Sequence, residues 1–194
     1  MIKLLLVDDH TAVRAGLVAL LRSEPGLVAV GASGSVSGAL AAVRGHDPDV
    51  VVLDYHLPDG DGLSLCRTLK RLEPAPAVVV YSAYAGSRLA LASVVAGADC
   101  LVEKGAPADE LFEAIREVAR GRRLQSATDR EQVTLAAEAL DADDVPILGM
   151  LMERMPHAEI AEALRVGPAD VERRIDTMVH RLRPPTDPPL RATG

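Results

Sequence analysis

Five polar side chains in the first 104 residues stand directly after short apolar runs. They are Asp8, Asp9, Asp54, Ser82 and Lys104. The three carboxylates would repel each other if they shared one pocket. Their coexistence calls for a hard cation bound by oxygen ligands, most naturally Mg²⁺.

The serine and the lysine add the remaining chemistry of phosphoryl transfer. A carboxylate can hold a phosphoryl group covalently, while a metal ion and a lysine neutralise the developing charge. A single Asp after a strand is usually a turn or helix N-cap residue. It is the joint pattern that predicts a site in which Asp54 accepts a phosphoryl group, with Lys104 and the Ser82 hydroxyl beside it.

The elements that must position these groups alternate regularly through residues 1–120. The predicted strands lie at 2–7, 27–31, 49–53, 77–81 and 99–103, and the predicted helices at 11–22, 37–44, 62–73, 87–96 and 107–120. Strands that are apolar throughout indicate a parallel sheet with helices on both faces. Right-handed crossovers bring the carboxyl ends of such strands to one edge, where ligands bind. We therefore predict an α/β fold with a doubly wound, five-stranded parallel sheet.

The alternation stops after residue 120, and the rest of the chain is helical in its periodicity. Three helices are predicted at 141–153, 157–164 and 168–182, with a short Gly-containing turn before the last, as in a helix-turn-helix. The predicted organisation is an α/β domain at 1–121, a partly helical linker at 122–139, an all-α domain at 140–183 and a disordered Pro-rich tail at 184–194.

Residues 1–120 resemble the receiver domain of two-component response regulators. The matching stretches are LLLVDDH, VVLDYHLPDGDG, VVVYSAY and GADCLVEKGAP. The resemblance implies a flavodoxin-like fold and transfer of a phosphoryl group from a sensor histidine kinase to Asp54. It implies Mg²⁺ held by Asp9, Asp54 and the backbone carbonyl of His56, with Asp8 orienting a metal-bound water. Ser82 would move toward the phosphate, and Lys104 would pair with it.

Such a domain is no enzyme beyond its own phosphorylation and dephosphorylation. The rival interpretation is a phosphohydrolase like the haloacid dehalogenases, which carry a second Asp two residues after the nucleophile, where this chain has His56. The chain also departs from the receiver pattern, because Leu101 and Val102 replace the usual aromatic residue before the lysine. Tyr84 is a candidate for that role, and the side chain of His56 for tuning the lifetime of the phosphate.

The C-terminal stretch EIAEALRVGPADVERRIDTMVHRL resembles the LuxR-type helix-turn-helix of the NarL/FixJ class, with residues 168–182 as its recognition helix. The resemblance implies a transcription regulator that binds DNA, with a homodimer as one option. The candidate DNA contacts are Arg173, Arg174, Arg181 and Arg183. The family usually has Thr-Val-Lys where this chain has Asp170-Val171-Glu172, so two acids would weaken the contact with DNA.

Charge favours a second interpretation of the helical domain. Residues 125–194 contain eight Arg and no Lys against thirteen Asp and Glu, and eight minus thirteen gives a net charge of −5. DNA-binding domains gain much of their affinity by neutralising phosphates. The alternative is therefore a phosphorylation-dependent adaptor or antagonist whose degenerate helix-turn-helix binds protein rather than DNA.

Composition sets the remaining expectations. The whole chain has a net charge of −7 and only 2% aromatic residues, which argues against a generally basic or base-stacking surface. Its two cysteines match no metal-ligand spacing, and a reduced cytoplasmic setting fits them. No apolar run approaches the ~18 residues of a transmembrane helix, so no membrane partner is expected.

Overall fold

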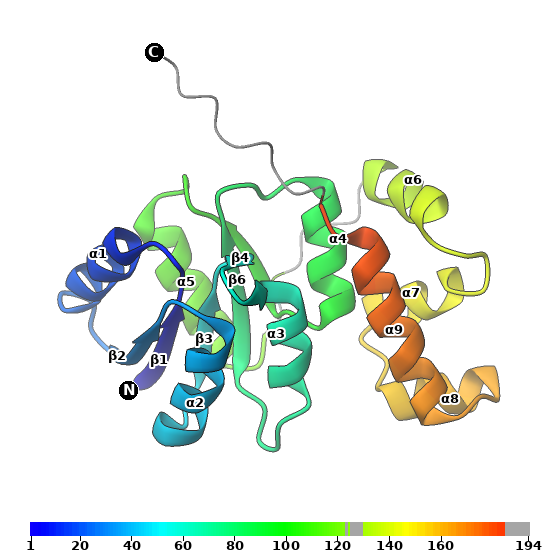
Figure 1. Cartoon of the computed structure of the whole chain (residues 1–194), viewed down its shortest axis with the longest axis horizontal. Coiled ribbons are helices and arrows are strands. Elements are labelled where there is room, and N and C mark those ends of the chain that lie inside the picture. Colours follow the sequence, from blue (N-terminus) through cyan, green and yellow to red (C-terminus); the bar gives the residue numbers. More distant parts are fainter. Residues whose placement is uncertain (123, 125–129, 185–194) are drawn as a thin grey trace, which may run out of the picture.

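The computed structural model describes residues 1–122, 124 and 130–184, which form an α/β part and a helical part that lie side by side (Figure 1). Most of the predicted tail, and residues 123 and 125–129 of the predicted linker, lie outside the described residues. Among the helices that are described, none combines the length and the apolar character that crossing a bilayer requires.

Five parallel strands form the main sheet, in the order β2-β1-β3-β6-β7. They are β1 (Ile2–Val7), β2 (Leu27–Ser33), β3 (Val50–Leu53), β6 (Ala77–Ser82) and β7 (Cys100–Glu103). The central strands β1 and β3 are almost wholly buried, which confirms the predicted sheet with two covered faces. The strand order reverses direction at β1, so the crevice that binds ligands in such sheets lies at the carboxyl ends of β1 and β3.

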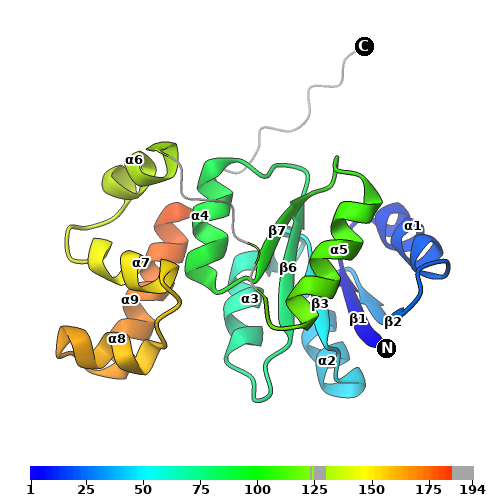
Figure 2. The same ribbon diagram turned by 180° about the vertical axis from the view of Figure 1, so that it is seen from behind.

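Helices cover both faces of this sheet (Figures 1 and 2). On one face α1 (Thr11–Leu21) and α5 (Ala108–Ala119) pack on one apolar cluster. On the other face lie α2 (Val36–His46), α3 (Gly62–Lys70) and α4 (Ser87–Ala96), which share a second cluster. This arrangement is the predicted flavodoxin-like fold.

A small hairpin after β3 was not predicted. Strands β4 (His56–Leu57) and β5 (Gly60–Asp61) pair antiparallel directly before α3. Because each strand has only two residues, it shows no alternation of apolar and polar positions by which the sequence could predict it. The hairpin closes tightly on the end of β3, because the Gly62 amide donates to the Tyr55 carbonyl at 2.7 Å.

Four helices lie in residues 130–184, the described portion of the second part of the chain. They are α6 (Arg130–Ala139), α7 (Val145–Met152), α8 (His157–Leu164) and α9 (Pro168–Leu182). Helix α6 lies in the segment that was predicted as a partly helical linker. Helix α7 begins later than the predicted start at 141, because Pro146 lacks an amide hydrogen and favours a place in the first turn.

Helix α9 packs lengthwise against α4 of the α/β part (Figures 1 and 2). Apolar residues of α3 and α4 belong to the same cluster as the buried face of α9, formed by Val171, Ile175, Met178, Val179 and Leu182. The apolar core therefore continues from the sheet, through α3 and α4, into the helical part.

Candidate phosphoacceptor site

Two buried carboxylates and one lysine meet at the carboxyl edge of the sheet. Asp8 follows β1 and is 3% exposed, and Asp54 follows β3 and is 4% exposed. Lys104 follows β7, and its Nζ lies 2.8 Å from Asp54 Oδ2 and 2.6 Å from Asp8 Oδ2. The parallel topology thus brings together groups that are up to 96 positions apart in the chain, between Asp8 and Lys104.

Burial and neighbouring charge act in opposite directions on the protonation of these groups. Burial raises the pKa of Asp54 and outweighs the lowering by its hydrogen bond with Lys104, while the charge of Asp8 raises it further. Burial alone would lower the pKa of Lys104, but its bonds to Asp54 and Asp8 raise it overall. Lys104 is therefore cationic at neutral pH, yet one ammonium does not balance two carboxylates. The site can accommodate further positive charge.

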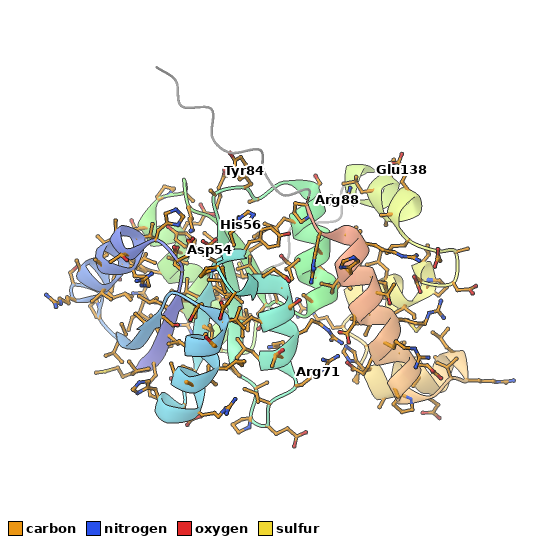
Figure 3. The ribbon with its side chains drawn as sticks, viewed as in Figure 1. Asp54, His56, Arg71, Tyr84, Arg88 and Glu138 are labelled. Carbon is orange, nitrogen blue, oxygen red and sulfur yellow. The ribbon has the colours of Figure 1, made fainter. Side chains whose placement is uncertain are left out.

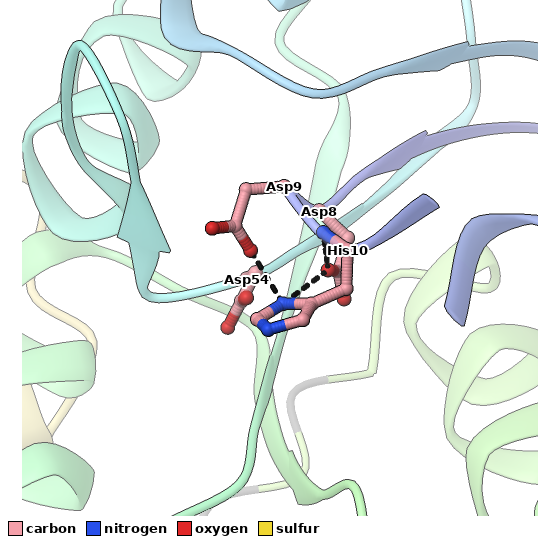
Figure 4. Close-up of side chains that lie close together, drawn as sticks. All are labelled: Asp8, Asp9, His10 and Asp54. Atoms are coloured by element: carbon pink, nitrogen blue, oxygen red, sulfur yellow. Dashed lines mark hydrogen bonds and ion pairs between the residues drawn. The ribbon is translucent and has the colours of Figure 1, made fainter. Parts of the chain in front are cut away.

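The side chains at this edge form a donor set for a divalent cation (Figure 4). Asp8, Asp9, His10 and Asp54 each offer a ligand atom, and these atoms lie within 4.8 Å of one another. Carboxylate oxygens are the ligands that hard divalent cations prefer. The acidic pocket therefore fits a divalent metal ion, as its three carboxylates predicted.

His10 is a member of this cluster that the sequence analysis missed. Its Nδ1 lies 2.5 Å from Asp9 Oδ1 and 3.4 Å from Asp8 Oδ1, and its amide donates to Asp8 Oδ1 at 2.8 Å. The one available signal was its place directly after the two acids. That signal is weak, because a histidine in such a position usually faces solvent.

Ser82 and Tyr81 lie at the end of β6, and Tyr84 lies in the loop that follows. Ser82 is buried, and its Oγ accepts a hydrogen bond from the Tyr84 amide at 3.3 Å. The Lys104 amide donates to the Ser82 carbonyl at 2.8 Å, which ties the lysine to this strand end. Tyr84 is 58% exposed, whereas Lys104 Nζ lies 5.9 Å from the centroid of the Tyr81 ring.

Tyr81 is a second residue that the sequence analysis missed. It pairs in register with Val102, one of the two positions where the receiver pattern usually has an aromatic residue. The aromatic ring beside the lysine is thus supplied by β6 instead of β7. Its position directly before Ser82 is the signal that could have found it.

His56 opens the hairpin on the same side of the molecule as Asp54 (Figure 3). Its side chain is exposed, and its ring meets the ring of Tyr55 edge-on, with the centroids 4.5 Å apart. The predicted metal ligand is its backbone carbonyl, and that role stays a prediction.

The four arginines predicted to contact DNA all make ion pairs within the chain. Arg173 is exposed and pairs with Asp170 of the same helix. The other three arginines form ion pairs with residues outside α9. The N···O distances are 2.9 Å from Arg174 to Asp144, 2.6 Å from Arg181 to Asp141 and 2.8 Å from Arg183 to Asp61. Of these four arginines, Arg173 is exposed and the other three are half-buried. Their role in DNA binding stays a prediction.

Two acids of α9 form ion pairs with the α/β part, although Glu172 is only half-buried and Asp176 is exposed. Glu172 lies 2.5 Å from Arg67 Nη2 and 3.0 Å from Arg71 Nη2, and it also pairs with His157. Asp176 lies 3.0 Å from Arg67 Nε and 2.9 Å from Arg71 Nη2. Glu172, one of the two acids expected to weaken the contact with DNA, thus helps to hold α9 on α3.

Comparison with known proteins decides the family. A family model described as the response regulator receiver domain matches residues 4–116, more than half of the chain. The chain belongs to the response regulators. The receiver resemblance is confirmed, and the phosphohydrolase interpretation is set aside.

Relatives that match along most of the chain place this response regulator in the NarL/FixJ class. The DNA-binding transcriptional activator DevR/DosR of Mycobacterium tuberculosis is 35% identical, over 94% of this chain and 88% of that protein. A crystal structure of a LuxR-family response regulator from Aurantimonas sp. is 31% identical, with a TM-score of 0.61 over 71% of this chain and 96% of that one.

A DNA-bound relative shares the fold of the whole chain. The structure of RcsB from Salmonella enterica bound to a promoter covers 96% of this chain and 94% of its own, with a TM-score of 0.60 and 19% identity. The fold of this response regulator, a receiver followed by helices, is therefore similar to that of RcsB along most of both chains.

Proposed function

We propose that Asp54 accepts a phosphoryl group from the phosphohistidine of a sensor kinase and thereby controls DNA binding by α9. The buried contact of Asp54 with Lys104 carries the first half of this proposal. An Asp54 carboxylate oxygen would attack phosphorus, the bond from phosphorus to the histidine nitrogen would break, and the electron pair would stay on the imidazole. Lys104 would follow the negative charge from the carboxylate to the new phosphoryl oxygens.

The other predicted residues have distinct tasks in this step. Asp9, Asp54 and the His56 carbonyl would hold Mg²⁺, and Asp8 would orient a water bound to it. When bound, the ion would neutralise the charge that develops on the phosphoryl oxygens. Ser82 would donate its hydroxyl to one of those oxygens after leaving the Tyr84 amide.

The second half of the proposal rests on the contact of α9 with α3 and α4. A recognition helix must enter the major groove of DNA, and the receiver restricts the access of DNA to α9 because α4 packs along one of its sides. We infer that phosphorylation shifts the population toward a state in which α9 is released. The pairing of Glu172 with Arg67 and Arg71 gives this acid a role in the docked state, and the similarity to the DNA-binding activator DevR/DosR favours a regulator over a protein-binding adaptor.

The partners follow from this scheme. The phosphoryl donor is a sensor histidine kinase, and the target is double-stranded DNA. A homodimer would present two copies of α9 to two half-sites. As for other response regulators of this class, the site of action would be the cytoplasm.

The test is an electrophoretic mobility shift with DNA from upstream of the protein's own gene, at two salt concentrations. Phosphorylated wild-type protein should bind about 5- to 150-fold more tightly than unphosphorylated protein, the usual range of coupling between sites. Binding should weaken as salt rises, because phosphate contacts release counterions. Asp54→Asn should show no such gain. Failure of the phosphorylated protein to bind even at low salt would instead favour the adaptor.

A further inference from the structure

Two arginines hold the C-terminal end of α9 against the receiver. Arg88 of α4 donates from Nη2 to the Arg181 carbonyl at 2.8 Å and from Nε to the Leu182 carbonyl at 3.3 Å. Carbonyls at the end of a helix have no partner within the helix and carry its negative dipole end, so a guanidinium fits there. Arg183 donates from Nη2 to Ser64 Oγ at 2.8 Å and pairs with Asp61 Oδ2 at 2.8 Å.

The partner of Arg183 is linked directly to the phosphoacceptor. Asp61 is the N-cap of α3, and its Oδ1 accepts the Ser64 amide at 2.9 Å. The next residue, Gly62, packs so closely that a Cβ there would lie 2.2 Å from the Asp54 carbonyl oxygen. Because this contact leaves no free space, a shift of the backbone at Asp54 must be transmitted to Gly62 and Asp61.

Arg88 lies just after the loop that leaves the phosphoacceptor site at the end of β6. It is the second residue of α4, and the short loop from Ser82 leads into that helix. Figure 3 shows Arg88 at the same side of the molecule as Asp54, near the end of α9. The two loops that leave the ends of β3 and β6 therefore both reach the same end of α9.

A second group of ion pairs between α9 and the receiver lies away from the site. Arg67 and Arg71, which bind Glu172 and Asp176, stand at the C-terminal end of α3. Figure 3 shows Arg71 lower in the view than Asp54, toward the other end of α3. Arg67 and Arg71 stand at the far end of α3 from Asp61 and Gly62, so we expect a local shift at Asp54 to change their contacts less than it changes the contact of Arg183.

We propose that Arg88 and Arg183 form a latch that transmits the state of Asp54 to α9, while Arg67 and Arg71 only add affinity to the docking. The proposal rests on the proposed function, since it assigns residues to the release of α9. Both arginines act through other groups and are positioning residues. Because coupling is reciprocal, the latched state must bind a phosphoryl group less well than the released state.

Hydrogen exchange of the α9 amides tests the latch in the full chain. Exchange is compared without and with Mg²⁺ and beryllofluoride, the phosphoryl mimic, whose binding is followed separately by calorimetry. In the wild type, beryllofluoride should speed exchange of α9 by a factor of about 5 to 150. In Arg88→Ala and Arg183→Ala, exchange should already be fast without the mimic, and the factor should approach one.

Arg71→Ala is the matched control, because it removes an arginine from the same interface. It should speed exchange in both states and keep the wild-type factor. Arg183→Lys keeps the charge but loses the forked donor, and should give an intermediate factor. A wild-type factor in both Arg88→Ala and Arg183→Ala would overturn the latch alone. If the wild type binds beryllofluoride and α9 exchange stays the same, the proposed function fails and the latch fails with it.

Discussion

Lys104 is the residue that lets two buried carboxylates stand side by side at the edge of the sheet. Its ammonium contacts both Asp8 and Asp54, and these contacts keep its pKa above the usual value in spite of burial. A phosphoryl group on Asp54 would add negative charge at the same place. The lysine is thus placed to stabilise the phosphorylated as well as the free carboxylate.

Gly62 gives a prediction at the scale of one residue. A methyl group there would lie 2.2 Å from the Asp54 carbonyl oxygen and 2.9 Å from the Tyr55 Cα, both backbone atoms that cannot move freely. Gly62→Ala should therefore lower the free energy of unfolding by about 1–3 kcal/mol, the usual cost of overpacking. Urea unfolding followed by circular dichroism measures the change.

Gly16 is the matched control for this substitution. It lies inside α1, and an added Cβ would meet no atom within 4 Å. Gly16→Ala should raise the free energy of unfolding by up to about 1 kcal/mol, because alanine is the better helix former. Equal effects of the two substitutions would show that the close approach of Gly62 to Asp54 carries no cost.

The sequence predicts the convergence of those site residues whose positions are set by the backbone. Asp8, Asp54 and Lys104 were found because strand topology alone brings them together, whatever their side chains do. His10 and Tyr81 were missed because their contacts depend on side-chain orientation. The spacing of residues carries no information about that orientation.

At the scale of elements, α9 is stabilised by a charged contact that can be removed by acid. Burial would raise the pKa of Glu172, but His157, Arg71 and Arg67 lower it overall to about 2. A carboxyl group whose pKa is lower in the folded than in the unfolded protein stabilises the fold above its unfolded pKa. That contribution is lost as pH falls from the ordinary value of 4.5 toward about 2.

Glu172→Gln tests this dependence. At neutral pH the variant should be less stable than the wild type by about 1 kcal/mol, between the values for exposed and buried charged contacts. The difference should shrink as pH falls from the ordinary value of 4.5 toward about 2, as measured by urea unfolding at each pH. Glu162→Gln, at an exposed position of α8, should show no such difference. A difference that grows on acidification would refute the assigned role of Glu172.

The elements themselves were predictable where they are long and periodic. The five main strands and the helices of the receiver follow from apolar runs and amphipathic spacing. The hairpin of β4 and β5 could not be found in this way, because two residues define no period. The packing of α9 on α4 could not be found either, since two amphipathic helices of one chain do not specify their partner.

The whole molecule is a receiver and a helical part that share one apolar cluster. Docking gives two acids of α9, Glu172 and Asp176, basic partners on α3. Release of α9 would remove these arginines and leave Glu172 with His157. The ion pairs therefore favour the docked state, and we propose that phosphorylation shifts the balance toward release.

Phosphoryl uptake by Asp54 is the claim on which the regulation depends, and intact-protein mass spectrometry tests it directly. After incubation with acetyl phosphate and Mg²⁺, the wild type and Asp109→Asn, which changes an exposed acid at the start of α5, should each gain the mass of one phosphoryl group. Asp54→Asn should gain none, and neither should the wild type after chelation of divalent metal. Labelling of Asp54→Asn at the wild-type rate would contradict the account.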